Sequence, residues 1–135
     1  MTVLVKSLVK SRLPVLPYEP LARQILGTEY ELSVVFVGSR RMQTMNRRYR
    51  GKNVDTNVLA FPLSEKSGEI VLNPSRTKGF SLLQLLIHGM LHLKGLRHGS
   101  TMETTEQELL KIFSHDQTHR DWNRRGDARS ARSCC

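Results

Sequence analysis

Three histidines in the second half of the chain have the spacing of a metal site. His88 and His92 are four residues apart, so on a helix their imidazoles lie on one face with Cβ atoms roughly 5 to 6 Å apart. Gly95 is placed to end that helix and turn the chain back, which brings His98 towards the same point. Three neutral imidazoles with one vacant position are typical of a catalytic zinc site, because structural sites usually have four protein ligands. Ligand type alone also fits nickel, and a tetrahedral three-imidazole geometry favours zinc.

Two other interpretations of these histidines are less favoured. As ordinary core residues of a leucine-rich helix, His88 and His92 would each need hydrogen-bond partners out of water. The spacing H-x-x-x-H-x-x-G-x-x-H is also that of metzincin peptidases, in which a glutamate after the first histidine acts as the general base. Here that residue is Gly89, and no carboxylate in the motif replaces the glutamate. The sequence therefore disfavours a peptidase.

The chain carries a strong excess of positive charge. Twenty-one Lys and Arg residues against twelve Asp and Glu give a net charge of +9, which favours polyanions such as nucleic acid. No acidic residue lies between Glu31 and Asp55, and the cations gathered there are Arg40, Arg41, Arg47, Arg48, Arg50 and Lys52. A solvated helix face explains any one of them, but the cluster predicts a nucleic-acid-binding surface. No apolar run approaches the roughly 18 residues that a membrane span needs, so we expect no transmembrane segment.

Three sequence blocks resemble the YbeY family of metal-dependent endoribonucleases, which mature ribosomal RNA. The histidine segment His88–His98 reads HGMLHLKGLRH and is similar to the family's signature helix, approximately HGxLHLxGYDH. The segment Met45–Pro62 reads MNRRYRGKNVDTNVLAFP and resembles the family's LNxxYRGKDxPT(D/N)VLSFP. The segment Gly68–Leu72 resembles the family's GD(I/L) followed by a strand. The blocks occur in the family's order over roughly residues 45 to 98.

The resemblance implies a function and a set of site residues. His88, His92 and His98 would bind one zinc ion, and Arg50 would be the catalytic arginine. The activity would be zinc-dependent, single-strand-specific endoribonuclease cleavage in ribosomal RNA processing, small-subunit maturation and ribosome quality control. Contacts to the RNA backbone would come from Arg40, Arg41, Arg47, Arg48 and Lys52, with Asn57, next to Thr56, as a further candidate to line the cleft.

The implied partners are ribosomal RNA and the small ribosomal subunit, with small-subunit ribosomal proteins or an assembly GTPase as further candidates. The implied compartment is the cytoplasm, with an organellar matrix as the alternative. Cys134 and Cys135 are adjacent and so cannot form a disulfide framework, which favours a reducing compartment. The alternative function is a zinc-stabilised RNA-binding factor for ribosome assembly with little catalytic activity.

The chain departs from the family pattern at two acidic positions. The family's acid before the third histidine is Arg97 here, so a carboxylate that orients a ligand imidazole is missing or comes from elsewhere. The family's aspartate in the third block is Glu69. The link from Asn73 to the histidine helix is also short, which predicts a lost helix or a longer histidine helix.

Periodicity and turn residues predict the elements that position these side chains. Strands are expected at 3–8, 31–37, 58–63 and 69–73, and helices at 21–26, 40–49, 82–94 and 103–113. Pro62 indicates an edge strand or a bulge, and the turn at 64–68 indicates a hairpin. Ser39 is the expected N-cap of the basic helix, with Met42, Met45 and Tyr49 facing the core. Ser81 and Gln84 form a capping-box pattern that opens the histidine helix, which is apolar on most sides and therefore buried.

The order of these elements predicts an α+β fold. We expect a single domain over residues 1–115, in which a mixed sheet of about four strands is backed by helices and the metal site lies on the central helix. Residues 116–135 are rich in arginine and are expected to form a basic, flexible tail.

Overall fold

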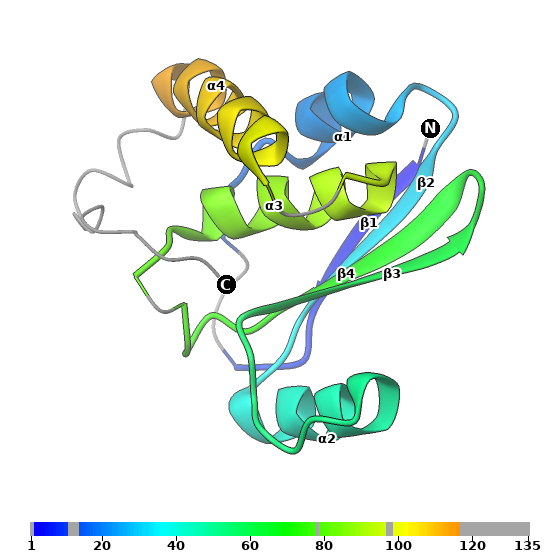
Figure 1. Ribbon diagram of the computed structural model, residues 1–135, viewed down its shortest axis with the longest axis vertical. Helices are drawn as coiled ribbons and strands as arrows, with labels where there is room; N and C mark the ends of the chain where they lie inside the picture. The colour runs from blue at the N-terminus through cyan, green and yellow to red at the C-terminus, as the bar shows by residue number, and fades with distance from the viewer. Residues whose placement is uncertain (1, 11–13, 78, 97–98, 117–135) are drawn as a thin grey trace.

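Helices and strands are interspersed along the chain without strict alternation (Figure 1). The structure is a computed structural model that describes residues 2–10, 14–77, 79–96 and 99–116. In chain order the elements are β1 (Thr2–Ser7), α1 (Tyr18–Leu26), β2 (Glu31–Phe36), α2 (Ser39–Arg50), β3 (Val58–Ser64), β4 (Ser67–Leu72), α3 (Leu82–Lys94) and α4 (Ser100–Asp116). The predicted α+β class with a four-stranded mixed sheet is confirmed.

The sheet has the strand order β1-β2-β4-β3. Strands β1, β2 and β4 are parallel, whereas β3 pairs antiparallel with β4, which confirms the predicted hairpin. Strand β3 lies at the edge of the sheet, and its register shifts between Pro62 and Ser64. This is the position expected for a strand that contains proline, because the ring removes a backbone donor.

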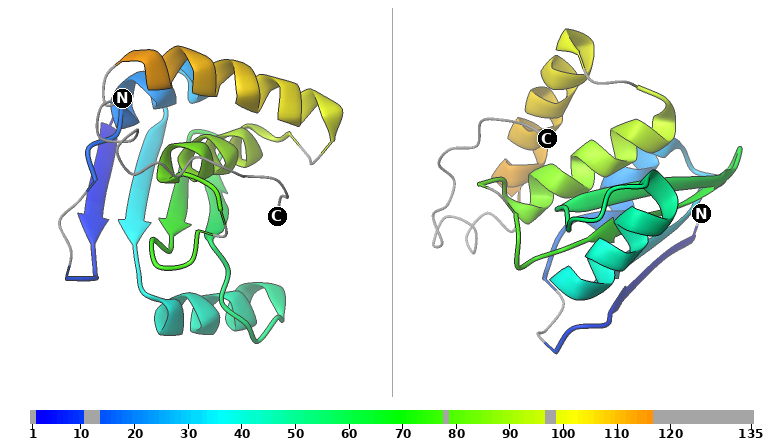
Figure 2. Two further views of the ribbon diagram at one scale, coloured as in Figure 1. Left: turned by 90° about the vertical axis from the view of Figure 1, so that its left-hand side faces the viewer. Right: turned by 60° about the horizontal axis from the view of Figure 1, so that its bottom comes forward.

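Both faces of the sheet are buried by alternating residues of the same strands. On β2, Val34 and Phe36 belong to a large core beneath α1, α3 and α4, whereas Val35 contributes to a second core on the opposite face. Met42 of α2 packs into this second core. Figure 2 shows the three helices α1, α3 and α4 on one side of the sheet and α2 at the end towards which β1, β2 and β4 run.

Helix α3 is the central element. It contacts α1, α4, β3 and β4, and its buried residues are Leu83, Gln84, Leu85, Leu86, Ile87, Gly89, Met90 and Leu91. A helix surrounded on so many sides has little solvent-exposed surface, which agrees with its apolar sequence. The prediction of a buried histidine helix is confirmed.

Two local predictions for α2 are wrong. The N-cap is Gly38, which has no side chain to cap the helix, and Ser39 is the first helical residue. The Ser39 hydroxyl accepts a hydrogen bond from Nδ2 of Asn73 at 3.2 Å. Tyr49 is 62% exposed and not in the core. Its ring packs on Phe61, with centroids 4.9 Å apart, and since β3 is an edge strand no further strand covers the tyrosine.

Helix α1 starts three residues earlier than predicted, at Tyr18, because Pro20 lies in its first turn, where proline is tolerated. Helix α3 begins directly after Ser81, so the short link has not lengthened it at its start. Helix α4 starts three residues earlier and ends three residues later than predicted, reaching Asp116. The tail was predicted over 116–135: Asp116 belongs to α4, and residues 117–135, including Cys134 and Cys135, lie outside the described residues. Within the described residues, none of the helices is long and apolar enough to cross a membrane.

Candidate active site

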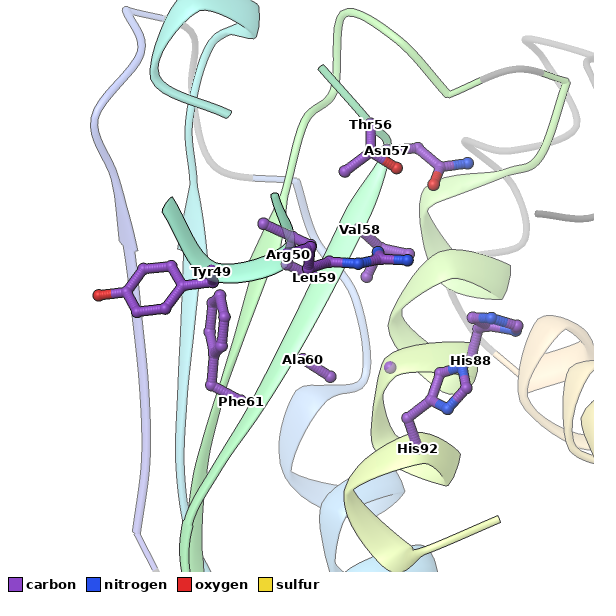
Figure 3. Close-up of a pocket in the computed structure, with 11 residues that line it drawn as sticks. Tyr49, Arg50, Thr56, Asn57, Val58, Leu59, Ala60, Phe61, His88 and His92 are labelled. Atoms are coloured by element: carbon purple, nitrogen blue, oxygen red, sulfur yellow. The ribbon is translucent and has the colours of Figure 1, made fainter. Parts of the chain in front are cut away.

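Helix α3 carries His88 and His92 one turn apart, and both side chains line the same cleft as residues of β3 (Figure 3). The Ser81 hydroxyl accepts from the Gln84 backbone N–H at 3.0 Å, which confirms the predicted cap and fixes where the helix starts. The imidazole centroids are 4.7 Å apart, with the rings nearly perpendicular at 84°. Gly95 ends the helix with φ of +105°, a left-handed conformation that glycine adopts readily. The chain therefore turns immediately after the second histidine.

Glu106 on α4 contacts the imidazole of His88. Its Oε1 lies 3.1 Å from Nδ1 of His88, and its Oε2 accepts a hydrogen bond of 2.7 Å from Nε2 of Gln84. Glu106 is only 7% exposed. Both carboxylate oxygens are thus engaged by side chains of α3.

The sequence prediction missed Glu106, although a signal for it was present. Met102, Glu106 and Leu109 fall on one face of α4, and all three are buried. A glutamate within the apolar face of an amphipathic helix needs a buried partner, since an unpaired buried charge is costly. That partner proves to be a predicted metal ligand.

Arg50 reaches the same site from α2. It is the last residue of that helix, because Gly51 follows with φ of +73° and its N–H bonds to the carbonyl of Arg47. Figure 3 shows the Arg50 guanidinium directed towards α3 and His88. The structure therefore brings together Arg50, His88 and His92, which the sequence prediction took from two separate blocks.

These side chains line one open cleft of about 610 Å³. Its described lining residues are Tyr49, Arg50, Thr56, Asn57, Val58, Leu59, Ala60, Phe61, His88, Gly89 and His92. No carboxylate occurs among them, so the cleft combines a guanidinium and imidazoles with apolar walls. This composition suits a phosphate group better than a cationic substrate.

Gly89 stands where the metzincin peptidases have their general-base glutamate, and it packs closely on β4. A Cβ atom on this residue would lie 3.0 Å from Cγ2 of Ile70 and 3.2 Å from its Cδ1. Glycine at this position therefore allows close packing of α3 on β4. A side chain at this position would require the Ile70 side chain to shift.

Asn57 and Thr56 lie at the rim of the cleft, as expected. Asn57 is only 1% exposed, and its Nδ2 donates a hydrogen bond to the Thr77 carbonyl at 3.4 Å. Asn73, which the sequence prediction did not single out, holds this segment. It is fully buried, and its Nδ2 donates to the Thr56 carbonyl at 3.2 Å, while its Oδ1 accepts from the Ser75 hydroxyl at 2.9 Å.

The other predicted RNA-binding cations are exposed, but they lie outside this cleft. Arg40 and Arg41 border a second, shallower groove together with Leu8, Val9, Gly38 and Thr44. Arg47, Arg48 and Lys52 are exposed at the end of α2 and just after it. A substrate that contacts all of these cations would have to extend along α2 and beyond the cleft.

The described residues include some of the predicted metal ligands. His88 and His92 offer two imidazoles from one helix face, and Glu106 contacts the first of them at Nδ1. His98, the third predicted ligand, and the adjacent Arg97 lie outside the described residues. Within the described part of the chain, no group of three or more His, Cys, Asp or Glu residues could hold a metal ion. The described residues therefore supply two of the three predicted ligands.

Comparisons with known proteins match both the sequence and the fold. The family described as Endoribonuclease YbeY matches residues 15–116. A relative of that name from Chromohalobacter salexigens is 35% identical over 116 residues, which cover 70% of this chain and 75% of the relative. Another, from Paraburkholderia phymatum, is 32% identical over 117 residues, 76% of each chain.

Two further matches define the extent of the similarity. An Endoribonuclease YbeY from Thermodesulfovibrio yellowstonii is 36% identical over 103 residues, and the match spans only 62% of that relative's length. The solution structure of TM1509 from Thermotoga maritima superimposes with a TM-score of 0.55 at 20% identity, covering 99% of this chain and all of the other. At that identity the likeness supports the fold alone. The family match over most of the described residues, together with the relatives at about 35% identity, shows that this chain belongs to the YbeY family.

Proposed function

We propose that this chain is a zinc-dependent endoribonuclease that hydrolyses phosphodiester bonds of single-stranded RNA. The observation that carries the proposal is the cleft in which Arg50 faces His88 and His92. The printed name of the matching relatives, Endoribonuclease YbeY, supports the same reaction class. The proposed substrate is ribosomal RNA, cut during maturation of the small ribosomal subunit and in ribosome quality control.

His88, His92 and His98 are the proposed zinc ligands. When bound, zinc would supply a Lewis acid for a phosphoryl oxygen of the RNA. The carboxylate of Glu106 on α4 contacts the first of these proposed ligands, since its Oε1 lies 3.1 Å from Nδ1 of His88.

Arg50 has a separate role in the proposed mechanism. Its guanidinium can donate two parallel N–H bonds to the non-bridging oxygens of one phosphodiester, which positions the group beside the histidines. The same contacts strengthen as negative charge builds on the phosphorus oxygens in the transition state. The apolar wall formed by Val58 and Ala60 of β3 limits water on the opposite side of the cleft.

The exposed cations of α2 and its following loop are the proposed RNA-backbone contacts. They are Arg40, Arg41, Arg47, Arg48 and Lys52, and none has an acidic partner among the described residues. Contacts of this kind give affinity that depends on salt and little on sequence. The proposed partners are the small ribosomal subunit, its proteins or an assembly GTPase, in the cytoplasm or, alternatively, an organellar matrix.

A substitution series at Arg50 tests the catalytic role. The assay is cleavage of a labelled single-stranded ribosomal RNA fragment, with zinc content measured for each protein. Arg50→Ala should keep its zinc and lose about 100-fold to 1,000-fold in rate, and Arg50→Lys should recover only part, because an ammonium cannot form the bidentate contact. The matched control is Arg23→Ala, which removes an exposed arginine from α1. Cleavage by Arg50→Ala at the parent rate would contradict the assignment.

A second candidate function is a zinc-stabilised RNA-binding factor for ribosome assembly with little catalytic activity. The net charge of +9 and the exposed cations of α2 favour it. The same assay separates the two functions, because this factor would bind the fragment tightly and release it uncut. Negligible RNA affinity at moderate salt would contradict the binding factor.

A further inference from the structure

A buried carboxylate joins α4 to the proposed metal site. Glu106 is 7% exposed, and its two oxygens contact Nδ1 of His88 at 3.1 Å and Nε2 of Gln84 at 2.7 Å. Gln84 and His88 are four residues apart and therefore lie on one face of α3. The carboxylate is thus held in a fixed orientation against the helix that carries both histidines.

The charge of this carboxylate is not balanced by a lysine or an arginine among the described residues. Gln84 offers a neutral amide, and a neutral His88 ring can offer only the proton on Nδ1. A buried anion with two neutral donors is poorly compensated. A cation bound at the other nitrogen of the same ring would compensate it.

We propose that Glu106 is a positioning residue of the metal site, which holds His88 in the tautomer with the proton on Nδ1 and thereby directs Nε2 to the metal. This inference rests on the metal site of the proposed function. The family pattern has an acid before the third histidine, where this chain has Arg97. The carboxylate comes instead from α4, through packing against α3.

The alternative to positioning is a purely structural role for Glu106 through the same contacts. In that case Glu106 would only fasten α4 to α3, and its replacement would lower stability equally with and without metal. If Glu106 is a positioning residue, its replacement lowers the affinity for metal, and the stability of the metal-free protein does not fall. The two roles are therefore separated by comparing metal-free and metal-loaded protein.

The variant that separates them is Glu106→Gln, tested on the full chain with zinc alone as the probe. Glutamine keeps the size of the side chain, and the Gln84 amide can rotate to restore a hydrogen bond, so mainly the charge is lost. The matched control is Glu108→Gln, the same chemical change at an exposed position of α4. Zinc affinity is measured by competition with a chromophoric chelator, and the melting temperature is recorded before and after zinc addition.

The expected result is zinc affinity about 10-fold to 100-fold weaker for Glu106→Gln and unchanged for Glu108→Gln. The melting temperature of metal-free Glu106→Gln should equal or exceed that of the metal-free parent, while the rise on zinc addition should be smaller. Equal zinc affinity for Glu106→Gln and the parent would overturn the inference. A lower melting temperature with the same rise on zinc addition would also overturn it, in favour of the structural role.

Nitrogen-15 NMR of the metal-free parent provides a second measurement, at about pH 8 where an ordinary imidazole is neutral. The His88 ring should carry its proton on Nδ1, and a proton on Nε2 would overturn the inference. Neither measurement uses RNA. A parent that binds zinc more tightly than Glu106→Gln but leaves RNA uncut would support this inference and contradict the proposed activity. A parent that binds no zinc would overturn the metal site and the inference together.

Discussion

Arg50, the last residue of α2, faces His88 of the central helix α3 across one cleft (Figure 3). The two residues belong to different sequence blocks and to elements on different sides of the sheet. Edge strand β3 brings them together, because it pairs with β4 next to α3 and its residues Val58–Phe61 line the cleft between them. A guanidinium opposite imidazoles, with no carboxylate among the described lining residues, is an arrangement suited to a phosphodiester.

The exposed arginines of α2 should control the salt dependence of RNA binding. The double substitution Arg47→Ala with Arg48→Ala should lower the slope of log affinity against log salt by about 1.4, at about 0.7 for each lost phosphate contact on single strands. The measurement is a titration of a labelled single-stranded RNA at several salt concentrations. The control pair, Arg23→Ala with Lys66→Ala, removes the same charge from exposed positions on α1 and the β3–β4 hairpin. Equal slopes for the two pairs would show that the α2 arginines do not contact the backbone.

Gly68 should be intolerant of a side chain, because α3 and Tyr30 both approach it closely. A Cβ atom there would clash with the Tyr30 hydroxyl and lie 2.9 Å from Cδ2 of Leu93. Gly68→Ala should lower the free energy of unfolding by about 1 to 3 kcal/mol, measured by urea denaturation. At Gly38 an added Cβ would meet only Val9, at 3.8 Å, so Gly38→Ala serves as the comparison and should cost less. The packing argument fails if the two variants are equally stable.

Asn73 should stabilise the rim of the cleft through its buried side chain. Asn73→Ala leaves the Thr56 carbonyl and the Ser39 hydroxyl without their donor, which should lower the free energy of unfolding by about 1 to 3 kcal/mol. RNA cleavage should fall as well, since Thr56 lines the cleft. Urea denaturation and the cleavage assay measure the two effects. Parent-like stability of Asn73→Ala would contradict the role assigned to this network.

Much of the fold follows from local sequence features. Periodicity predicted α3, Ser81 and Gly95 marked its two ends, and Pro62 identified the edge strand, because each of these signals acts within a few residues. Tyr49 was assigned to the core by the same periodicity, which cannot reveal that α2 ends beside an edge strand.

The site was predicted only where its residues lie in motifs. His88, His92 and Arg50 have motif spacing, and the structure places them in one cleft. Glu106 and Asn73 act through packing between elements distant in the sequence, α4 on α3 and the loop after β4 on the loop before β3. Their partners depend on tertiary structure. The apolar face of α4 indicates that Glu106 needs a buried partner, but it cannot indicate that the partner is His88.

The central claim is that this chain cuts RNA with a metal held by the histidines of α3. The most direct test compares cleavage of a labelled ribosomal RNA fragment by the parent and by His92→Ala, at equal concentration and salt, before and after zinc removal with a chelator. The account predicts that the parent cuts the fragment, stops when zinc is removed and recovers when it is returned, while folded His92→Ala neither retains zinc nor cuts. Cleavage by His92→Ala at the parent rate, or by the parent without metal, would contradict it.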